Sequence, residues 1–186
     1  MLGADAVIAH TQKWLSRVVI GHGLCPFAKA EFDAGRIDYA VITAEGLENL
    51  IEPVLTACDA LNTDKTIATS LLIYPGAFLD FEDYLDALDL AERLLTDQGY
   101  DGIYQLASFH PRYVFDGAAA EDASHYTNRS PYPMFHILRE TSVAAALEAY
   151  PNPEAIPARN IELTRRLGVS VMRDLLLACS RNEGHT

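Results

Sequence analysis

Three short apolar segments separated by stretches of helical periodicity constrain this fold most strongly. They cover residues 37–43, 67–74 and 103–109. Their length, their β-branched and aromatic content and the turn residues that bound them are typical of buried strands. The sequence therefore predicts a β-α-β-α-β core, with helices covering a sheet of three to five strands. A wound parallel sheet and a ferredoxin-like antiparallel sheet both fit, so the expected class is α/β or α+β.

Apolar residues at helical spacing predict helices between these strands and on either side of them. Pro53 lies inside one pattern, so that helix either starts near Asn49 or is kinked. Gly168 weakens the last pattern, and Cys25-Pro26 opens a further short helix. The main predicted helices cover residues 4–20, 47–61, 81–98, 131–149 and 157–180.

The length of 186 residues and the 49% content of hydrophobic residues favour a single domain over residues 1–186. No apolar run approaches the ~20 residues that cross a bilayer, so no membrane partner is expected. The segment 1–11 has no basic region of the kind that begins a signal peptide, which favours the cytoplasm. The three cysteines are widely spaced and form no CxxC pair, so neither a disulfide framework nor a zinc ribbon is expected.

The net charge of −12 is unevenly distributed. Residues 45–97 hold twelve acidic side chains against two basic ones, whereas residues 159–181 hold five arginines against two acidic side chains. Nucleic-acid binding is disfavoured because the phosphate backbone requires a broad basic surface. The acidic middle of the chain is interpreted as a solvated face.

Residues 111–130 form an irregular segment rich in Tyr, Asp and Asn. Loops of this length are usually functional or disordered, and the aromatic residues Tyr113, Phe115 and Tyr126 argue against disorder. Such a loop is suited to form the wall of a pocket. The polar, aromatic region between Phe109 and Glu140 is therefore the candidate site.

Three motifs carry a family resemblance. They are Cys25-Pro26-Phe27-Ala28, Ser108-Phe109-His110-Pro111, and the run from Thr127-Asn128-Arg129-Ser130-Pro131-Tyr132-Pro133-Met134 through His136 to Arg139-Glu140. Together they resemble the bacterial family catalogued as domain of unknown function 1415, and the resemblance spans nearly the whole chain. It implies no activity. Histidine is often absent from that family at the positions of His22 and His125, which makes both weaker site candidates.

A metal centre is the first functional hypothesis. His136 and Glu140 are four residues apart on a predicted helix, so both would project from one face. His110 follows a predicted strand, where site residues of α/β sheets commonly lie. Two imidazoles and a carboxylate suit non-haem Fe(II) or a catalytic zinc with an open position, and Asp116 or Asp122 would add an oxygen. The alternative is an ordinary ion pair between His136 and Glu140.

An activated thiol is the second hypothesis. Cys25 precedes Pro26 at a predicted helix start, where unpaired N–H groups favour the thiolate. His110 or His136 would then act as the base in Cys-His nucleophilic catalysis. The alternative is that Cys25 is a small buried residue beside Leu24.

Anion recognition is the third hypothesis, and it is compatible with the first. Arg129 immediately precedes the helix expected to start at Ser130-Pro131, and a guanidinium beside free backbone N–H groups suits a carboxylate or phosphate. The alternative is that Arg129 holds the loop through backbone carbonyls. The expected substrate-binding residues are Arg129, Arg139, Asn128, Tyr113 and Arg112.

Together these patterns favour a metal-dependent enzyme, with iron or zinc, that acts on a small anionic molecule. The reaction class stays open between iron-dependent oxidation and metal-assisted hydrolysis. A thiol enzyme based on Cys25 and a non-enzymatic module that binds a small molecule or a protein are the alternatives. The enzyme hypotheses require His110 to converge with His136 and Glu140 on one cavity.

Overall fold

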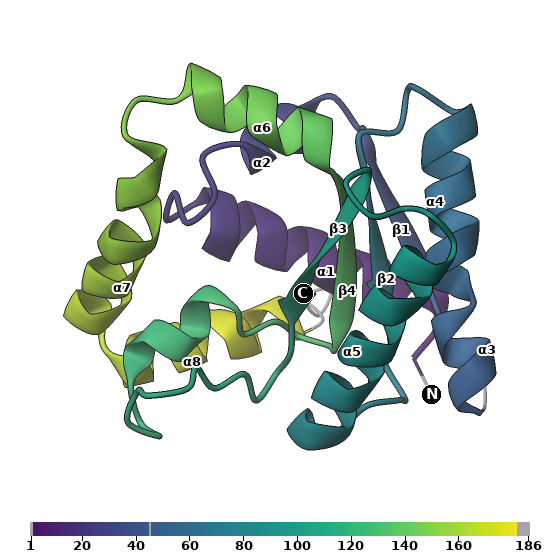
Figure 1. The fold of residues 1–186 in the computed structure, drawn as a ribbon. Helices are drawn as coiled ribbons and strands as arrows, with labels where there is room; N and C mark the ends of the chain where they lie inside the picture. Colours follow the sequence, from purple (N-terminus) through teal and green to yellow (C-terminus); the bar gives the residue numbers. More distant parts are fainter. Residues whose placement is uncertain (1, 45, 182–186) are drawn as a thin grey trace.

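The computed structural model describes residues 2–44 and 46–181, which form helices around an open four-stranded sheet (Figure 1). The strand order across the sheet is β1-β2-β4-β3. The α/β class expected from the sequence is confirmed. The strands are β1 (Ile37–Val41), β2 (Thr69–Ile73), β3 (Tyr104–Phe109) and β4 (Met134–Arg139).

Strand β4 makes this sheet mixed. β1 and β2 are parallel, whereas β4 pairs antiparallel with both β2 and β3. The first three strands therefore run in the same direction, and the last strand of the chain is inserted between β2 and β3. In the ferredoxin-like β-α-β-β-α-β order the second and third strands follow one another, whereas here α5 lies between β2 and β3, so the chain does not adopt that alternative.

The predicted helix over residues 131–149 is wrong in its first half. Residues Met134–Arg139 form β4, and helix α6 (Glu140–Ala149) begins only afterwards. All six β4 residues pair with β3, and five of them also pair with β2. Backbone pairing on both sides thus outweighs the helix-start signal at Ser130-Pro131, because tertiary context overrides local propensity. Alternate β4 side chains now point to opposite faces of the sheet.

One face of the sheet is covered by α3 (Leu47–Ile51), α4 (Pro53–Thr63) and α5 (Phe81–Asp97). Pro53 is the first residue of α4, and α3 already starts at Leu47. The helical pattern is therefore interrupted at the proline, which agrees with a kink rather than with a helix start near Asn49. The Asp80 side chain caps α5 by accepting a hydrogen bond from the backbone N–H of Glu82 at 3.0 Å. These helices connect the first three strands.

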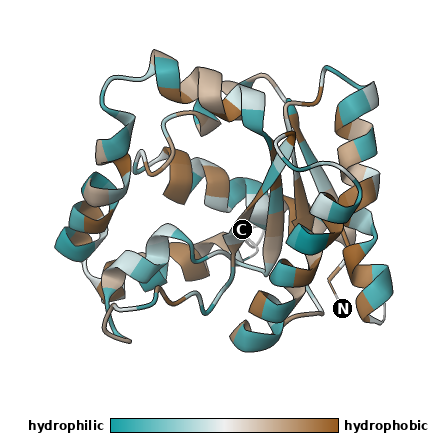
Figure 2. Ribbon diagram, in the orientation of Figure 1, coloured by the Kyte–Doolittle hydropathy of each residue, from teal (hydrophilic) through white to brown (hydrophobic). Residues whose placement is uncertain are grey.

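The other face packs against α1 (Ala4–Trp14), its π-helical continuation η1 (Leu15–Ile20) and α8 (Val169–Cys179). Helix α2 (Ala28–Asp33) starts three residues after Cys25 rather than at it. The predicted last helix is divided into α7 (Ile156–Leu167) and α8 by Gly168, whose φ of +83° is a conformation that favours glycine. Figure 2 shows apolar stretches on the strands and on α1, and mostly polar segments on α7.

Two short 3-10 helices, η2 (Ala123–Thr127) and η3 (Pro153–Ala155), complete this side of the protein. η2 lies within the aromatic loop and packs against α7 and α8. No helix in the described residues combines the length and apolar character needed to cross a bilayer.

Candidate functional site

His110 follows β3, as predicted, but its ring is fully buried and both nitrogens are hydrogen-bonded. The backbone N–H of Arg112 donates to Nδ1 at 3.0 Å, so Nε2 carries the proton and donates it to the carbonyl of Phe78 at 2.9 Å. The ring packs against Phe81 and Tyr84 of α5. Burial lowers the pKa of His110, which keeps the ring neutral. No ring nitrogen remains for a metal.

His136 lies in the middle of β4 and faces the opposite side of the sheet. Its ring packs near Phe109, which belongs to the apolar core beneath α1. The hydroxyl of Thr69 donates to the carbonyl of Ile137 at 2.5 Å and therefore accepts from Nε2–H of His136 at 2.7 Å. Burial lowers the pKa of His136 to about 4, so this ring is also neutral.

The structure does not bring the three expected metal ligands together. His110 points toward α5, whereas His136 points toward the face covered by α1. Glu140 is the first residue of α6, so the prediction that it shares a helix face with His136 is wrong. Within residues 2–44 and 46–181, no three His, Cys, Asp or Glu side chains are arranged to hold a metal ion.

Arg139 has a structural environment rather than a substrate-binding one. It lies at the end of β4, and its guanidinium donates to the carbonyls of Ile67 at 2.7 Å, Ala68 at 2.9 Å and Leu61. These carbonyls belong to the end of α4 and to the segment that leads into β2. Arg139 therefore joins three parts of the fold.

The other expected binding residues also stabilise the loop. Arg112 forms an exposed ion pair with Asp80 at the start of α5, with a nitrogen–oxygen distance of 3.0 Å. The side-chain amide of Asn128 donates to the carbonyl of Ser108 at 3.1 Å. The hydroxyl of Tyr113 lies 3.3 Å from that of Ser108. These contacts fasten the loop to β3 and α5.

Cys25 is partly buried and packs against the core beneath α1. It lies in the turn before α2, where its carbonyl accepts a hydrogen bond from the backbone N–H of Ala28 at 3.4 Å. Among the described residues, no hydrogen bond joins its thiol to a histidine. The geometry therefore provides no Cys-His pair.

His125, a weaker candidate from the sequence, organises the loop in the same way as His110. The backbone N–H of Phe115 donates to its Nδ1 at 3.1 Å, and its Nε2–H donates to the carbonyl of Ala119 at 2.8 Å. The ring is fully buried. Two imidazoles thus satisfy backbone groups in place of regular backbone pairing, which explains why the loop is ordered without regular structure.

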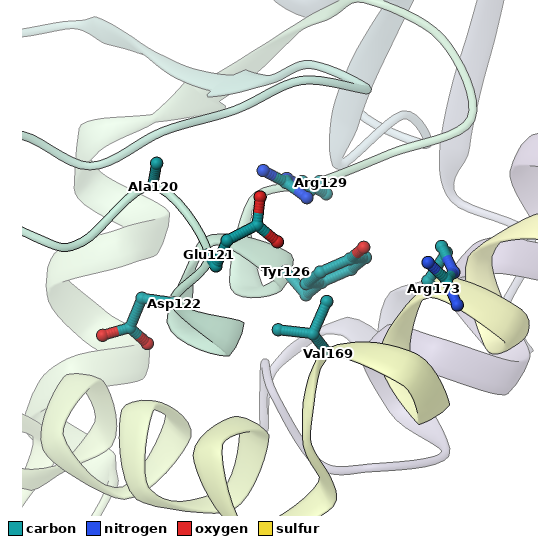
Figure 3. A pocket seen from close by; sticks show the side chains of 7 residues that line it. All are labelled: Ala120, Glu121, Asp122, Tyr126, Arg129, Val169 and Arg173. Atoms are coloured by element: carbon teal, nitrogen blue, oxygen red, sulfur yellow. The ribbon is translucent and has the colours of Figure 1, made fainter.

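A small pocket of about 170 Å³ lies between this loop and α8 (Figure 3). Four of its lining residues are charged, namely Glu121, Asp122 and Arg129 from the loop region and Arg173 from α8. Figure 3 shows Tyr126 in the middle of the pocket wall, with Arg129 and Arg173 on either side of it. The complete lining consists of Ala120, Glu121, Asp122, Tyr126, Arg129, Val169 and Arg173.

Arg129 combines a structural contact with a position in the pocket. Its Nε donates to the carbonyl of Tyr113 at 3.1 Å, and its guanidinium carbon lies 4.6 Å from the ring centroid of Tyr126. Its own carbonyl accepts a hydrogen bond from the indole of Trp14 at 3.1 Å. The side chain is therefore held at Nε and above an aromatic ring, while the ends of its fork border the pocket.

Asp122 belongs to the pocket wall but has its charge compensated. Arg165 of α7 binds both carboxylate oxygens, at 2.7–3.1 Å, and the backbone N–H of Ser124 donates to the same group. These contacts hold the pKa of Asp122 well below its usual range. Asp122 therefore connects η2 to α7 and does not serve the metal centre expected from the sequence.

The first turn of α8 also borders the pocket, through Val169. Its N-cap is Gly168, which has no side chain to accept hydrogen bonds, and no acidic residue lies in the first turn. Helix starts leave backbone N–H groups without intrahelical partners and carry a partial positive charge. Two guanidiniums and a helix start therefore meet at one small pocket.

The sequence interpretation included Arg129 but missed Arg173, Val169 and Glu121. Arg173 was seen only as part of the basic segment 159–181. The signal for Arg173 is the contrast between that segment and the acidic middle of the chain, and no such signal marks Val169 or Glu121. Its position beside the aromatic loop depends on the packing of η2 against α7 and α8.

A second hollow of about 360 Å³ lies between α3 and α5. Leu47, which is 51% exposed, contributes to its apolar wall, and two carboxylates stand at its rim. These charges disfavour an anion. Its lining residues are Leu47, Leu50, Phe78, Asp83, Asp86 and Ala87.

Fold and site together define a mixed α/β protein with an open sheet and a small pocket, lined by two arginines and two carboxylates, on the side away from α4 and α5. The chain belongs to the family described as "Protein of unknown function (DUF1415)", whose family model matches residues 6–174. This confirms the resemblance seen in the three motifs. No curated protein and no solved structure matches the chain.

Proposed function

We propose that this protein is a binding module for a small anionic molecule, held in the pocket between the aromatic loop and α8. The observation that carries the proposal is the convergence of Arg129, Arg173 and the start of α8 on one pocket. Guanidinium groups and free backbone N–H groups are the donors that carboxylates and phosphates prefer. In a chain with a net charge of −12, two arginines at one pocket mark a place where an anion can be attracted.

The two arginines differ in how they are held. Arg129 is partly buried and positioned by Tyr113 and Tyr126, so it loses little freedom when it binds a ligand. Arg173 is exposed, and the described residues give it no hydrogen bond or ion pair. Arg129 therefore supplies a fixed fork, and Arg173 supplies a charge that can adjust to the ligand.

The volume of the pocket restricts the ligand. A volume of about 170 Å³ equals roughly six water molecules at ~30 Å³ each. Pockets for drug-sized ligands are larger, at ~300–1,000 Å³. The pocket therefore suits a small carboxylate or phosphate rather than a nucleotide.

The enzyme hypotheses lose support for geometric reasons. The metal hypothesis needs His110, His136 and Glu140 to converge, and the two imidazoles lie on opposite faces of the sheet. The thiol hypothesis needs a histidine beside Cys25, and His110 and His136, the bases expected from the sequence, have their Nε2 atoms bound elsewhere. Binding rather than catalysis is the function that the pocket supports best.

The proposal also places the protein in the cytoplasm. All three cysteines are free thiols in the structure, which is common in a reducing compartment.

The proposal is tested by titrating the 15N-labelled protein with acetate, propionate and inorganic phosphate at low ionic strength. We expect shift changes in the backbone amides of residues 120–129 and 169–173. Arg173→Ala should weaken binding about tenfold, because a charge-assisted contact is lost. Arg166→Ala removes an equal charge from the exposed surface of α7 and should leave binding unchanged.

Arg129→Lys keeps the charge but removes the fork, so it should also weaken binding while preserving the fold. The proposal is wrong if none of the anions shifts these amides at millimolar concentration. It is equally wrong if Arg166→Ala weakens binding as much as Arg173→Ala, because the attraction would then be a general effect of charge.

A further inference from the structure

Glu121 is the one charged group of the pocket that anion binding does not explain. It lines the same pocket as Arg129 and Arg173, and Figure 3 shows its carboxylate between Arg129 and Tyr126. Within the described residues, no ion pair joins Glu121 to either arginine. Its neighbour Asp122 is compensated by Arg165, whereas Glu121 is not.

The pocket therefore carries charges of both signs. Two guanidiniums and the start of α8 supply the positive part, and one uncompensated carboxylate supplies the negative part. A simple monoanion would satisfy the first part but would meet repulsion from Glu121. A ligand that also carries an ammonium group would satisfy both parts.

We propose that the ligand is a small zwitterion whose anionic head binds Arg129 and Arg173 and whose ammonium group binds Glu121. This inference rests on the proposed function and names its ligand class. Ala120 and Val169 give the pocket two small apolar surfaces, which suit a short carbon skeleton between the charged ends. The limited volume restricts this skeleton to a few carbons.

Amino acids with a short side chain and small amino-phosphates both have this chemistry. In an α-amino acid one carbon joins the ammonium group to the carboxylate, and in O-phosphoethanolamine two carbons and an ester oxygen join the ammonium group to the phosphorus. The anionic head distinguishes the two classes, so the experiment includes a matched pair of compounds for each.

The test compares L-alanine with propionate and O-phosphoethanolamine with ethyl phosphate, using the amide shifts of the pocket to obtain dissociation constants. Each pair has a similar skeleton and differs in the ammonium group. We expect the zwitterion to bind about fivefold more tightly in at least one pair, which is the upper range for an exposed ion pair. Preference for one pair identifies the anionic head.

Glu121→Gln keeps the shape of the side chain and removes its charge. The variant should abolish the preference for the zwitterion by weakening its binding, and it should strengthen the binding of propionate and ethyl phosphate because the repulsion from Glu121 is removed. Glu162→Gln, an exposed substitution on α7 outside the pocket lining, is the matched control and should retain the preference.

The outcomes separate this inference from the proposed function. Equal binding within both pairs, or a preference that survives in Glu121→Gln, overturns the zwitterion while leaving anion binding in place. Absence of pocket shifts with all four compounds overturns both proposals.

Discussion

The Nε2 atom of His136 lies 2.7 Å from the hydroxyl oxygen of Thr69, across the pairing of β4 with β2. The same hydroxyl donates to the carbonyl of Ile137, so the imidazole must be the donor to Thr69. This arrangement uses one ring proton, and no hydrogen bond in it would use a second. A neutral histidine is therefore part of the central sheet.

The first prediction concerns stability and pH. The pKa of His136 falls from 6.5 to about 4 on folding, so the unfolded chain binds more protons between these two values. The free energy of unfolding should be highest above pH 6.5 and should decrease by roughly 2 kcal/mol as the pH falls to 4, a figure reduced because His136 is partly exposed to solvent. Burial lowers the pKa of His110 as well, so its contribution has the same sign.

Urea denaturation at a series of pH values measures this slope. His136→Gln should reduce it, because glutamine keeps an N–H donor for Thr69 but does not titrate. An unchanged slope in this variant would mean that another group is responsible.

The second prediction concerns the aromatic loop. His110→Ala removes a donor and an acceptor that the backbone of Phe78 and Arg112 uses, and it leaves a cavity beside α5. Unfolding free energy should fall by about 3 kcal/mol, and hydrogen exchange in residues 111–130 should accelerate. Tyr113→Phe removes only a long hydroxyl contact and should change stability by less than about 0.5 kcal/mol.

The third prediction concerns Arg139. Arg139→Met keeps much of the aliphatic stem but leaves the carbonyls of Leu61, Ile67 and Ala68 without their charged donor. We expect a loss of about 2–4 kcal/mol in unfolding free energy, measured by urea denaturation. Arg93→Met breaks an exposed ion pair on α5 and should cost less than about 1 kcal/mol. Similar losses in both variants would contradict the role given to Arg139.

The fourth prediction concerns the cysteines. Burial raises the pKa of Cys58 to about 12 and also raises that of Cys179, so both thiols should resist alkylation in the folded protein. Cys25 is partly exposed and should be the first to react with iodoacetamide, as followed by mass spectrometry of the intact protein and its peptides. A Cys25→Ser variant should bind anions normally. Loss of anion binding in that variant would instead return attention to the thiol hypothesis.

Local patterns predicted most of the secondary structure, because those elements have strong local signals. The strand preceding Pro75-Gly76 and the helix capped by Asp80 follow directly from residue preferences. Pro53 and Gly168 were recognised as weak points, and both mark helix boundaries. Strand β4 was missed because its conformation depends on two partners that are distant in sequence.

The candidate site was harder to predict, since it depends on direction as well as position. His110 occupies the expected strand end, yet its ring points to the face opposite His136. The spacing of His136 and Glu140 was interpreted with a helical period, whereas His136 belongs to a strand. The pocket itself combines Arg129 with α8, and no local pattern relates these segments.

The insertion of β4 between β2 and β3 has a consequence for biosynthesis. When the chain has emerged from the ribosome as far as residue 133, β2 and β3 are complete, but β4, which pairs with both of them, is still missing. Both strands then expose unpaired backbone edges, which are sites of aggregation. The sheet can close only after the later segment has been translated, so its assembly is a late and non-local event.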